Sequence, residues 1–173
     1  MTKFTSDRLL LFGATGDLSR RMLLPSLCAL DADGLLDPAI EIIGTARSEL
    51  DDQGFRNFAR EALEQFLPAN RRGSMATFLN RLSYQTLDAN DIGGFQALAA
   101  KVGTPKEGLS IFLSTAPSLF EPTIRGLQQS GLAGENVRIG LEKPLGVDLE
   151  SSKVINDAVA AAFPEDRIFR IDH

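Results

Sequence analysis

The fold is decided by the stretch Arg8-Leu9-Leu10-Leu11-Phe12-Gly13-Ala14-Thr15-Gly16-Asp17-Leu18-Ser19 near the N-terminus. It opens with a compact apolar run that ends in glycine, as expected of a β-strand buried on both faces. A glycine turn follows, and a helical pattern then runs from about Leu18 to Leu30. A strand, a turn and a helix in this order begin a β-α-β unit, which predicts a parallel sheet.

The same alternation continues to the end of the chain. Strands are expected at residues 8–13, 40–46, 83–87, 109–114, 137–141 and 167–171. Helices are expected at residues 18–30, 55–66 and 74–82, after 115–117, and from Asp148 onward. We therefore predict an α/β, Rossmann-like doubly wound domain over residues 1–173, with a mainly parallel sheet of about six strands and helices on both faces.

The composition excludes several classes of protein. The 173 residues include 18 Lys and Arg, 23 Asp and Glu, and 43% hydrophobic residues, so the chain packs a core and has an acidic balance that disfavours nucleic acid. One cysteine, Cys28, and one histidine, His173, exclude an internal disulfide or a zinc cluster, and no metal is expected. Without a membrane-spanning run or a signal peptide, we expect a cytoplasmic protein.

The glycines after the first strand fit a turn that binds the phosphates of a dinucleotide. Gly13 would let the chain reverse, and Gly16 would let the backbone approach a pyrophosphate without a Cβ in the way. Ser19 takes the third small position, so the spacing is G-x-x-G-x-x-S where G-x-G-x-x-G is usual. A purely structural turn is the alternative, and the order of strand, turn and helix favours the nucleotide.

The second strand ends at Arg47. An acidic residue at this place binds the ribose of NAD, whereas a basic residue suits the 2′-phosphate of NADP, so Arg47 predicts NADP. Arg47 lies farther from Gly16 than the usual spacing of about 20 residues, which the long first helix and its following loop explain. A surface arginine without a ligand is the alternative.

Two further motifs follow the last two strands. Glu142-Lys143-Pro144-Leu145-Gly146 lies at the sheet edge where ligands bind, so Lys143 could hold a substrate oxygen or phosphate, although a tight turn is the alternative. Arg170-Ile171-Asp172-His173 ends the chain. Neighbouring strand residues point to opposite faces, so Asp172 and His173 should serve different partners. A disordered terminal histidine is the other interpretation.

Taken together, these motifs resemble the glucose-6-phosphate dehydrogenase family. The Gly-Asp-Leu turn, Arg47, the Glu-Lys-Pro motif and the Arg-Ile-Asp-His motif occur in the family's order along the whole chain. The resemblance implies an NADP-dependent oxidoreductase of the pentose phosphate pathway. It would move a hydride from C1 of glucose 6-phosphate to the cofactor, giving 6-phosphogluconolactone. It also implies that the full-length protein is a homo-oligomer.

The resemblance implies a role for each matching residue. The turn would bind pyrophosphate and ribose, through Gly13, Ala14, Thr15, Gly16, Asp17, Leu18 and Ser19. Arg47 would bind the 2′-phosphate, Asp88 and Ala89 would contact the adenosine, and residues 115–117 would lie beside the cofactor. Lys143 would be shared between cofactor and substrate, next to a cis-prone Pro144. Asp172 would orient a general-base histidine, and His173 would bind the sugar phosphate.

The sequence departs from the family pattern in several places. Met22 stands where a basic residue is frequent, Ser19 where alanine is usual, and Leu145 where phenylalanine is common. The family's general base is a second histidine in a C-terminal α+β domain for substrate binding and dimerisation, which these 173 residues do not contain. We therefore expect a chain that binds NADP but does not oxidise glucose 6-phosphate alone.

Two other functions stay open from the residues. One is a sugar dehydrogenase whose Glu-Lys-Pro lysine assists catalysis, although that group usually has a G-x-G-x-x-G turn. The other is a non-catalytic NADP-binding module, which would leave Lys143 and the Asp172-His173 pair unexplained.

Overall fold

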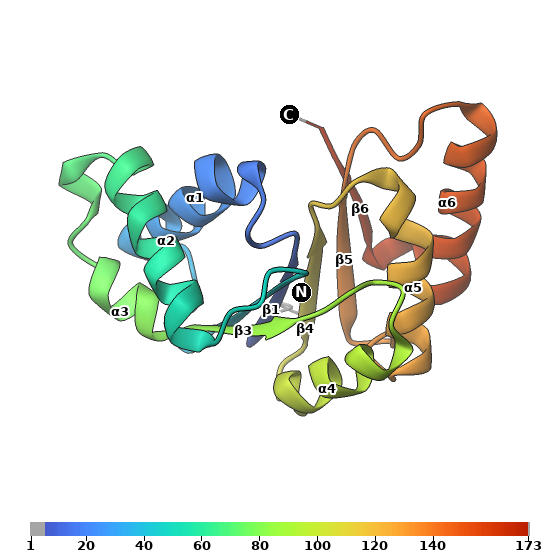
Figure 1. Cartoon of the computed structure of the whole chain (residues 1–173), viewed down its shortest axis with the longest axis horizontal. Coiled ribbons are helices and arrows are strands. Elements are labelled where there is room, and N and C mark those ends of the chain that lie inside the picture. Colours follow the sequence, from blue (N-terminus) through green and yellow to red (C-terminus); the bar gives the residue numbers. More distant parts are fainter. Residues whose placement is uncertain (1–5, 173) are drawn as a thin grey trace.

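The computed structural model describes residues 6–172, which form a single parallel sheet covered by helices (Figure 1). Its strand order is β3-β2-β1-β4-β5-β6, and each pairing is parallel. The strands are β1 (Arg8–Phe12), β2 (Glu41–Ala46), β3 (Leu82–Thr86), β4 (Leu109–Leu113), β5 (Val137–Glu142) and β6 (Ile168–Ile171). The predicted α/β fold is confirmed, and the strands differ from the expected ones only at their ends.

Helices lie on both faces of the sheet, and each face has its own core. The α-helices are α1 (Leu24–Ala32), α2 (Asp52–Phe66), α3 (Met75–Asn80), α4 (Ile92–Val102), α5 (Phe120–Gln129) and α6 (Leu149–Ala162). Short helical segments are η1 (Ser19–Leu23), η2 (Ala69–Arg71), η3 (Pro117–Leu119) and η4 (Glu165–Arg167). Helices α1 to α3 share one buried cluster with β1, β2 and β3, and α4 to α6 share another that reaches from β2 to β6.

The first helical segment contains a wider turn than the sequence predicted. Its residues Ser19–Leu23 are π-helical, and α1 continues from Leu24 to Ala32. Pro25 follows immediately and has no N–H to donate to the carbonyl one turn earlier, which is a recognised place for a helix to change its hydrogen-bond pattern. The helix expected at residues 18–30 is therefore present, with an irregular first part next to the glycine turn.

Helix α4 was not predicted from the sequence. It buries Phe95, Leu98 and Val102, a spacing that places all three on one helical face. Asp91 caps its N-terminus by accepting a hydrogen bond from the Gly93 amide at 3.0 Å. The capping residue and the apolar spacing are both readable in the sequence. The two glycines of the first turn weaken the helical pattern, because glycine disfavours helix interiors.

Asp7 joins the start of the sheet to the loop before β4. Its side chain accepts hydrogen bonds from the backbone amides of Lys106, Glu107 and Gly108 at 3.0 to 3.2 Å, and from Arg8 at 3.0 Å. Burial raises the pKa of Asp7, but the three amides and the charge of Arg8 outweigh it and hold the pKa below its ordinary 3.8. The charged carboxylate is thus the form that the folded state prefers.

We expect Asp7→Asn to lower the free energy of unfolding by about 2 kcal/mol at neutral pH, because one acceptor oxygen and the negative charge are lost. Since the folded pKa lies below the unfolded value of 3.8, the wild-type advantage is complete above that pH and disappears as the pH falls through the folded pKa. Urea denaturation at several pH values measures this difference. The exposed Asp157→Asn is the control, and equal losses in both variants would contradict the role of Asp7.

Candidate functional site

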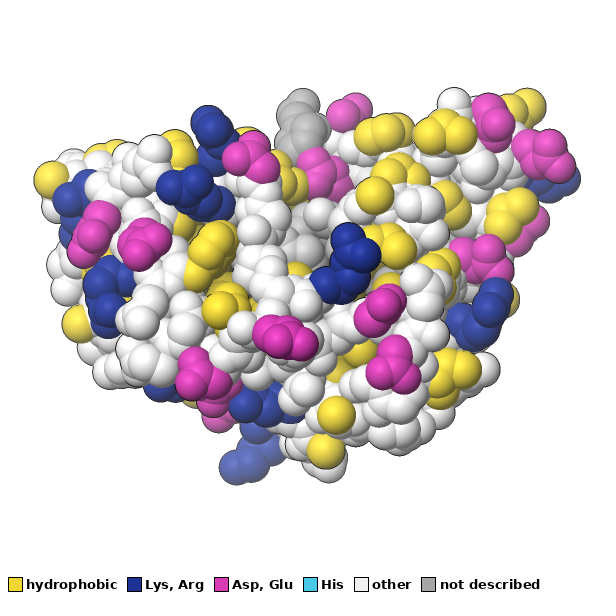
Figure 2. Space-filling model, viewed as in Figure 1, with side chains coloured by type: hydrophobic (Ala, Val, Ile, Leu, Met, Phe, Trp, Pro, Cys, Tyr) yellow, Lys and Arg dark blue, Asp and Glu magenta, His cyan; other side chains and the backbone are white. Residues whose placement is uncertain are grey.

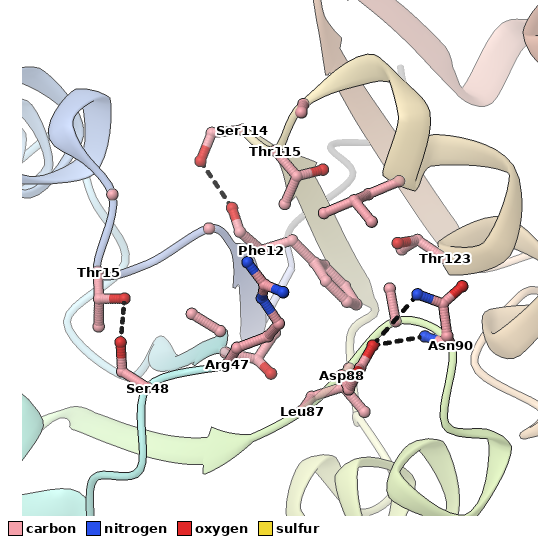
Figure 3. Close-up of a pocket in the computed structure, with 17 residues that line it drawn as sticks. Phe12, Thr15, Arg47, Ser48, Leu87, Asp88, Asn90, Ser114, Thr115 and Thr123 are labelled. Atoms are coloured by element: carbon pink, nitrogen blue, oxygen red, sulfur yellow. Dashed lines mark hydrogen bonds between the residues drawn. The ribbon is translucent and has the colours of Figure 1, made fainter.

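A cleft of about 360 Å³ opens at the carboxyl ends of strands β1 to β4 (Figure 3). It lies where the strand order reverses, since the chain runs outward from β1 to β3 and then returns to add β4 on the other side of β1. Ligands of open parallel sheets bind at such a reversal. The lining comprises Phe12, Gly13, Thr15, Gly16, Thr45, Ala46, Arg47, Ser48, Leu87, Asp88, Ala89, Asn90, Ser114, Thr115, Ala116, Leu119 and Thr123.

The glycine turn forms one wall of the cleft. Gly13 has a φ of +75°, and a Cβ there would lie 2.7 Å from the carbonyl oxygen of Ser114. The amides of Gly13 and Ala14 both donate to the carbonyl of Thr45, at 3.0 and 3.2 Å, which fixes the turn against β2. The Gly16 amide closes the turn on the Gly13 carbonyl at 3.0 Å. The result is a tight backbone cradle, and a larger residue at position 13 would clash with Ser114 beside it.

A helical segment starts directly after the turn, at Asp17. The first amides of a helix have no carbonyl partner within it, and the helix dipole favours negative charge at this end. The Asp17 carboxylate is paired with Arg21 at 2.7 Å, on the surface. Ser19 is completely buried and its hydroxyl has no partner among the described residues. Of the predicted turn residues, Gly13, Thr15 and Gly16 line the cleft, and the others lie behind or beside it.

Arg47 stands at the edge of the cleft with its guanidinium group over the cavity, between Thr15 and Asp88 (Figure 3). Its side chain makes no hydrogen bond or ion pair with any residue from 6 to 172. Most other arginines of the described chain have such a partner, for example Arg21 with Asp17. An unpaired cation directed into a cleft is available to an anionic ligand.

The backbone around Arg47 is held by two residues of β3 that no sequence motif marks. The Tyr84 hydroxyl lies 2.8 Å from the Ser48 carbonyl and 3.0 Å from the Ala46 carbonyl, and Thr86 donates to the same Ser48 carbonyl at 3.1 Å. Burial raises the pKa of Tyr84, so its hydroxyl keeps its proton and remains a donor at neutral pH. The loop that carries Arg47 is therefore fixed from β3.

The opposite wall comes from the loop after β3 and from the start of α5. Asp88 accepts from the Asn90 amide at 2.9 Å, which fixes a tight turn beside Ala89. Thr115 and Thr123 also line the cleft, and their buried hydroxyls have no partner in the described chain. The predicted contacts Asp88, Ala89, Thr115 and Ala116 are thus brought together with Arg47 and the glycine turn.

Lys143 and Asp172 lie together, but in a separate open hollow of about 470 Å³. The Lys143 ammonium is 3.8 Å from an Asp172 oxygen, and the Lys143 amide donates to the Ile171 carbonyl at 3.0 Å. The Lys143-Pro144 bond is cis, in agreement with the resemblance. Asp172 directly follows β6, which ends at Ile171. His173 lies outside the described residues.

Two of the unusual positions differ in their surroundings. Met22 is 50% exposed on the surface, whereas Leu145 is buried in the core shared with α5 and α6.

Exposed hydrophobic side chains gather around α6 and the loop before it, where Val147 and Leu149 are exposed (Figure 2). Among residues 6–172, no helix is long and apolar enough to cross a membrane, and no cluster of His, Cys, Asp or Glu is arranged to hold a metal.

Comparison with known proteins identifies the group to which this site belongs. Residues 10–173 match the family model described as "Glucose-6-phosphate dehydrogenase, NAD binding domain". The chain belongs to the glucose-6-phosphate dehydrogenase family. The part of the family that it matches binds a nicotinamide dinucleotide, which agrees with the cradle at the reversal of the sheet.

Relatives within the glucose-6-phosphate dehydrogenase family match nearly the whole chain. The glucose-6-phosphate 1-dehydrogenase of Zymomonas mobilis is 54% identical over 98% of this chain and 35% of its own length. That of Dickeya dadantii is 43% identical over 95% of this chain and 34% of its own length. The chain therefore spans about a third of the curated relatives it matches.

Solved structures agree with this assignment. The crystal structure of glucose-6-phosphate 1-dehydrogenase from Mycobacterium avium superposes with a TM-score of 0.83 at 34% identity, over 96% of this chain and 35% of that one. A glucose-6-phosphate dehydrogenase in complex with its substrate glucose-6-phosphate gives 0.84 at 30% identity, over all of this chain and 38% of that one. The resemblance inferred from the motifs is confirmed, and the separate sugar dehydrogenase group is not supported.

Proposed function

We propose that the chain is the NADP-binding part of an enzyme that oxidises glucose 6-phosphate to 6-phosphogluconolactone. The observation that carries the choice of NADP is Arg47, an unpaired cation at the end of β2 that is directed into the cleft. The Arg47 guanidinium has no negatively charged partner in the described chain. The 2′-phosphate of NADP would supply one, whereas the 2′-hydroxyl of NAD is uncharged.

The remaining wall residues suit the other parts of the cofactor. The pyrophosphate would lie on the cradle of Gly13 to Gly16, where the two glycines have no Cβ and the following helix presents its first amides. Ala14, Asp17, Leu18 and Ser19 would shape this cradle from behind. Asp88 and Ala89 would border the adenosine. When bound, the nicotinamide accepts the hydride, and the chain's own residues hold it in place.

The substrate would be bound at the ends of β5 and β6. Lys143 supplies a cation near the sheet edge, and Asp172 lies 3.8 Å from it. We propose that Lys143 contacts both the cofactor and the sugar phosphate, that His173 binds the phosphate, and that Asp172 orients the general base. The single histidine of the sequence is His173. The base would therefore come from the part of the relatives' length that these residues do not span.

Calorimetric titration of this polypeptide with NADP and with NAD tests the proposal. We expect NADP to bind at least about tenfold more tightly than NAD, because only NADP offers a phosphate to Arg47. The same titration with glucose 6-phosphate present should show NADP binding without formation of NADPH. Equal affinities for the two cofactors would contradict the assignment of Arg47, and NADPH formation would contradict the assignment of the base.

A further inference from the structure

One region of the cleft is unexplained by phosphate binding. Beyond Asp88 and opposite the glycine turn, the wall includes Leu87, Ala89, Leu119 and Thr123, and the Asn90 side chain lies beside Thr123 (Figure 3). These side chains are mostly apolar, and none carries a charge. A flat heterocycle with a few polar atoms on its edge fits such a wall better than a phosphate or a free sugar does.

Thr123 is the polar side chain of this wall that has no partner. It is 0% exposed and lies on α5, and its hydroxyl forms no hydrogen bond with any residue between 6 and 172. A threonine inside a helix can bond to a carbonyl one turn earlier, and this one does not. Buried hydroxyls in native proteins nearly always have a partner, so the missing bond needs an explanation.

The view of the cleft supports a partner within the cavity. Figure 3 shows the Thr123 hydroxyl directed toward the cavity from the side opposite Arg47. If a 2′-phosphate lies on Arg47 and a pyrophosphate on the glycine turn, the ribose that joins them lies between these two sites. The base is attached at C1′, next to the carbon that carries the 2′-phosphate and at the other end of the ring from C4′, which carries the pyrophosphate arm. We therefore place the base near Arg47 and across the cavity from it, on the side where Figure 3 shows Thr123.

We propose that the Thr123 hydroxyl hydrogen-bonds the polar edge of the adenine base, and so contributes to the choice of an adenine nucleotide. This inference rests on the proposed function. Adenine carries an amino group and ring nitrogens on its edge. A hydroxyl can accept a hydrogen bond from the amino group and donate one to a ring nitrogen. The bond satisfies the buried hydroxyl only when the nucleotide is bound, which adds to affinity without adding to the stability of the unliganded protein.

The test is Thr123→Val, which keeps the shape of the side chain and removes the hydroxyl. We expect its Kd for NADP to rise about 5- to 20-fold, the effect of one lost hydrogen bond. Unliganded Thr123→Val should be at least as stable to urea as the wild type, because a buried polar group without a partner is removed. Thr123→Ser retains the hydroxyl and should bind NADP within about threefold of the wild type.

A fragment of the cofactor locates the effect. Adenosine 2′,5′-bisphosphate contains the base, the ribose and the 2′-phosphate without the nicotinamide, so Thr123→Val should weaken it by the same factor as NADP. Thr77→Val, which removes an exposed hydroxyl bonded to the Ser74 carbonyl on α3, is the matched control and should change neither affinity.

The outcomes separate the inference from the proposed function. If the wild type binds NADP through Arg47 but Thr123→Val binds both ligands unchanged, the adenine contact is wrong and the proposed function stands. If Thr123→Val weakens NADP but not the bisphosphate, the hydroxyl serves the nicotinamide half, and the inference is overturned. If the wild type binds neither ligand, the proposed function fails, and the inference fails with it.

Discussion

Arg47→Ala should weaken NADP binding about 100-fold and leave NAD binding within about twofold of the wild type. Two charge-assisted hydrogen bonds from a guanidinium to a phosphate account for roughly 2.7 kcal/mol, which corresponds to this factor. The exposed Arg47 side chain makes no hydrogen bond or ion pair with residues 6–172, so the free energy of unfolding should stay unchanged. Calorimetric titration of the variant with both cofactors, together with urea denaturation, measures these effects.

Arg125→Ala is the matched control for Arg47. Arg125 is an exposed arginine on α5, paired with Glu121 at 2.6 Å, and it does not line the cleft. Arg125→Ala removes the same positive charge as Arg47→Ala. The Kd values for NADP and NAD should stay unchanged, apart from a small long-range electrostatic effect that salt screens. A parallel loss of NADP and NAD affinity in Arg47→Ala would show that Arg47 acts on the part that both cofactors share.

Gly13→Ala should abolish measurable cofactor binding and lower the free energy of unfolding by about 2–4 kcal/mol. Two physical effects add at this position. The φ of +75° disfavours any residue with a Cβ, and that Cβ would also lie 2.7 Å from the Ser114 carbonyl oxygen. Relief of the clash must move the turn away from β4, which distorts the backbone cradle. Urea denaturation and NADP titration of the variant measure both consequences.

Gly34→Ala separates the two effects. Gly34 has a similar φ of +70°, but nothing lies within 4 Å of the position that its Cβ would take. This variant should lose only the conformational contribution of about 1–2 kcal/mol, and it should bind NADP normally. If Gly13→Ala is no more destabilised than Gly34→Ala and still binds NADP, the close approach of Gly13 to Ser114 is not needed for stability or for cofactor binding.

The fold was predictable because its signals are local. A strand buried on both faces is a short apolar run, as Leu10 to Phe12 of β1 show. The edge strand β6 is buried only at Ile168, and its apolar residues still marked it as a strand. Helix α4 was missed because glycines occupy its first turn, although Phe95, Leu98 and Val102 carry its apolar spacing. In the structure, the Phe95 ring of α4 packs directly on Gly126 of α5, where any larger residue than glycine would clash with the ring. This contact between two helices explains α4 and cannot be read from the sequence.

The site was predictable only where function depends on the backbone or on the end of a strand. Gly13 and Gly16 were expected in the site because the turn itself requires glycine, and Arg47 because it directly follows β2. Tyr84 and Thr123 were not expected there, because the roles proposed for them depend on which side chains the sheet and α5 bring together in the fold. Sequence spacing does not encode such neighbours. It also did not indicate that Lys143 and Asp172 would lie in a hollow of their own.

A crystal structure of this polypeptide with NADP tests the central claim most directly. The account predicts the 2′-phosphate within hydrogen-bond distance of the Arg47 guanidinium, the pyrophosphate on the backbone between Gly13 and Asp17, and the adenine beside Thr123. The control is a crystal grown under the same conditions without NADP. NADP bound with its adenosine half in the hollow of Lys143 and Asp172, or with its 2′-phosphate turned away from Arg47 into solvent, would contradict the account.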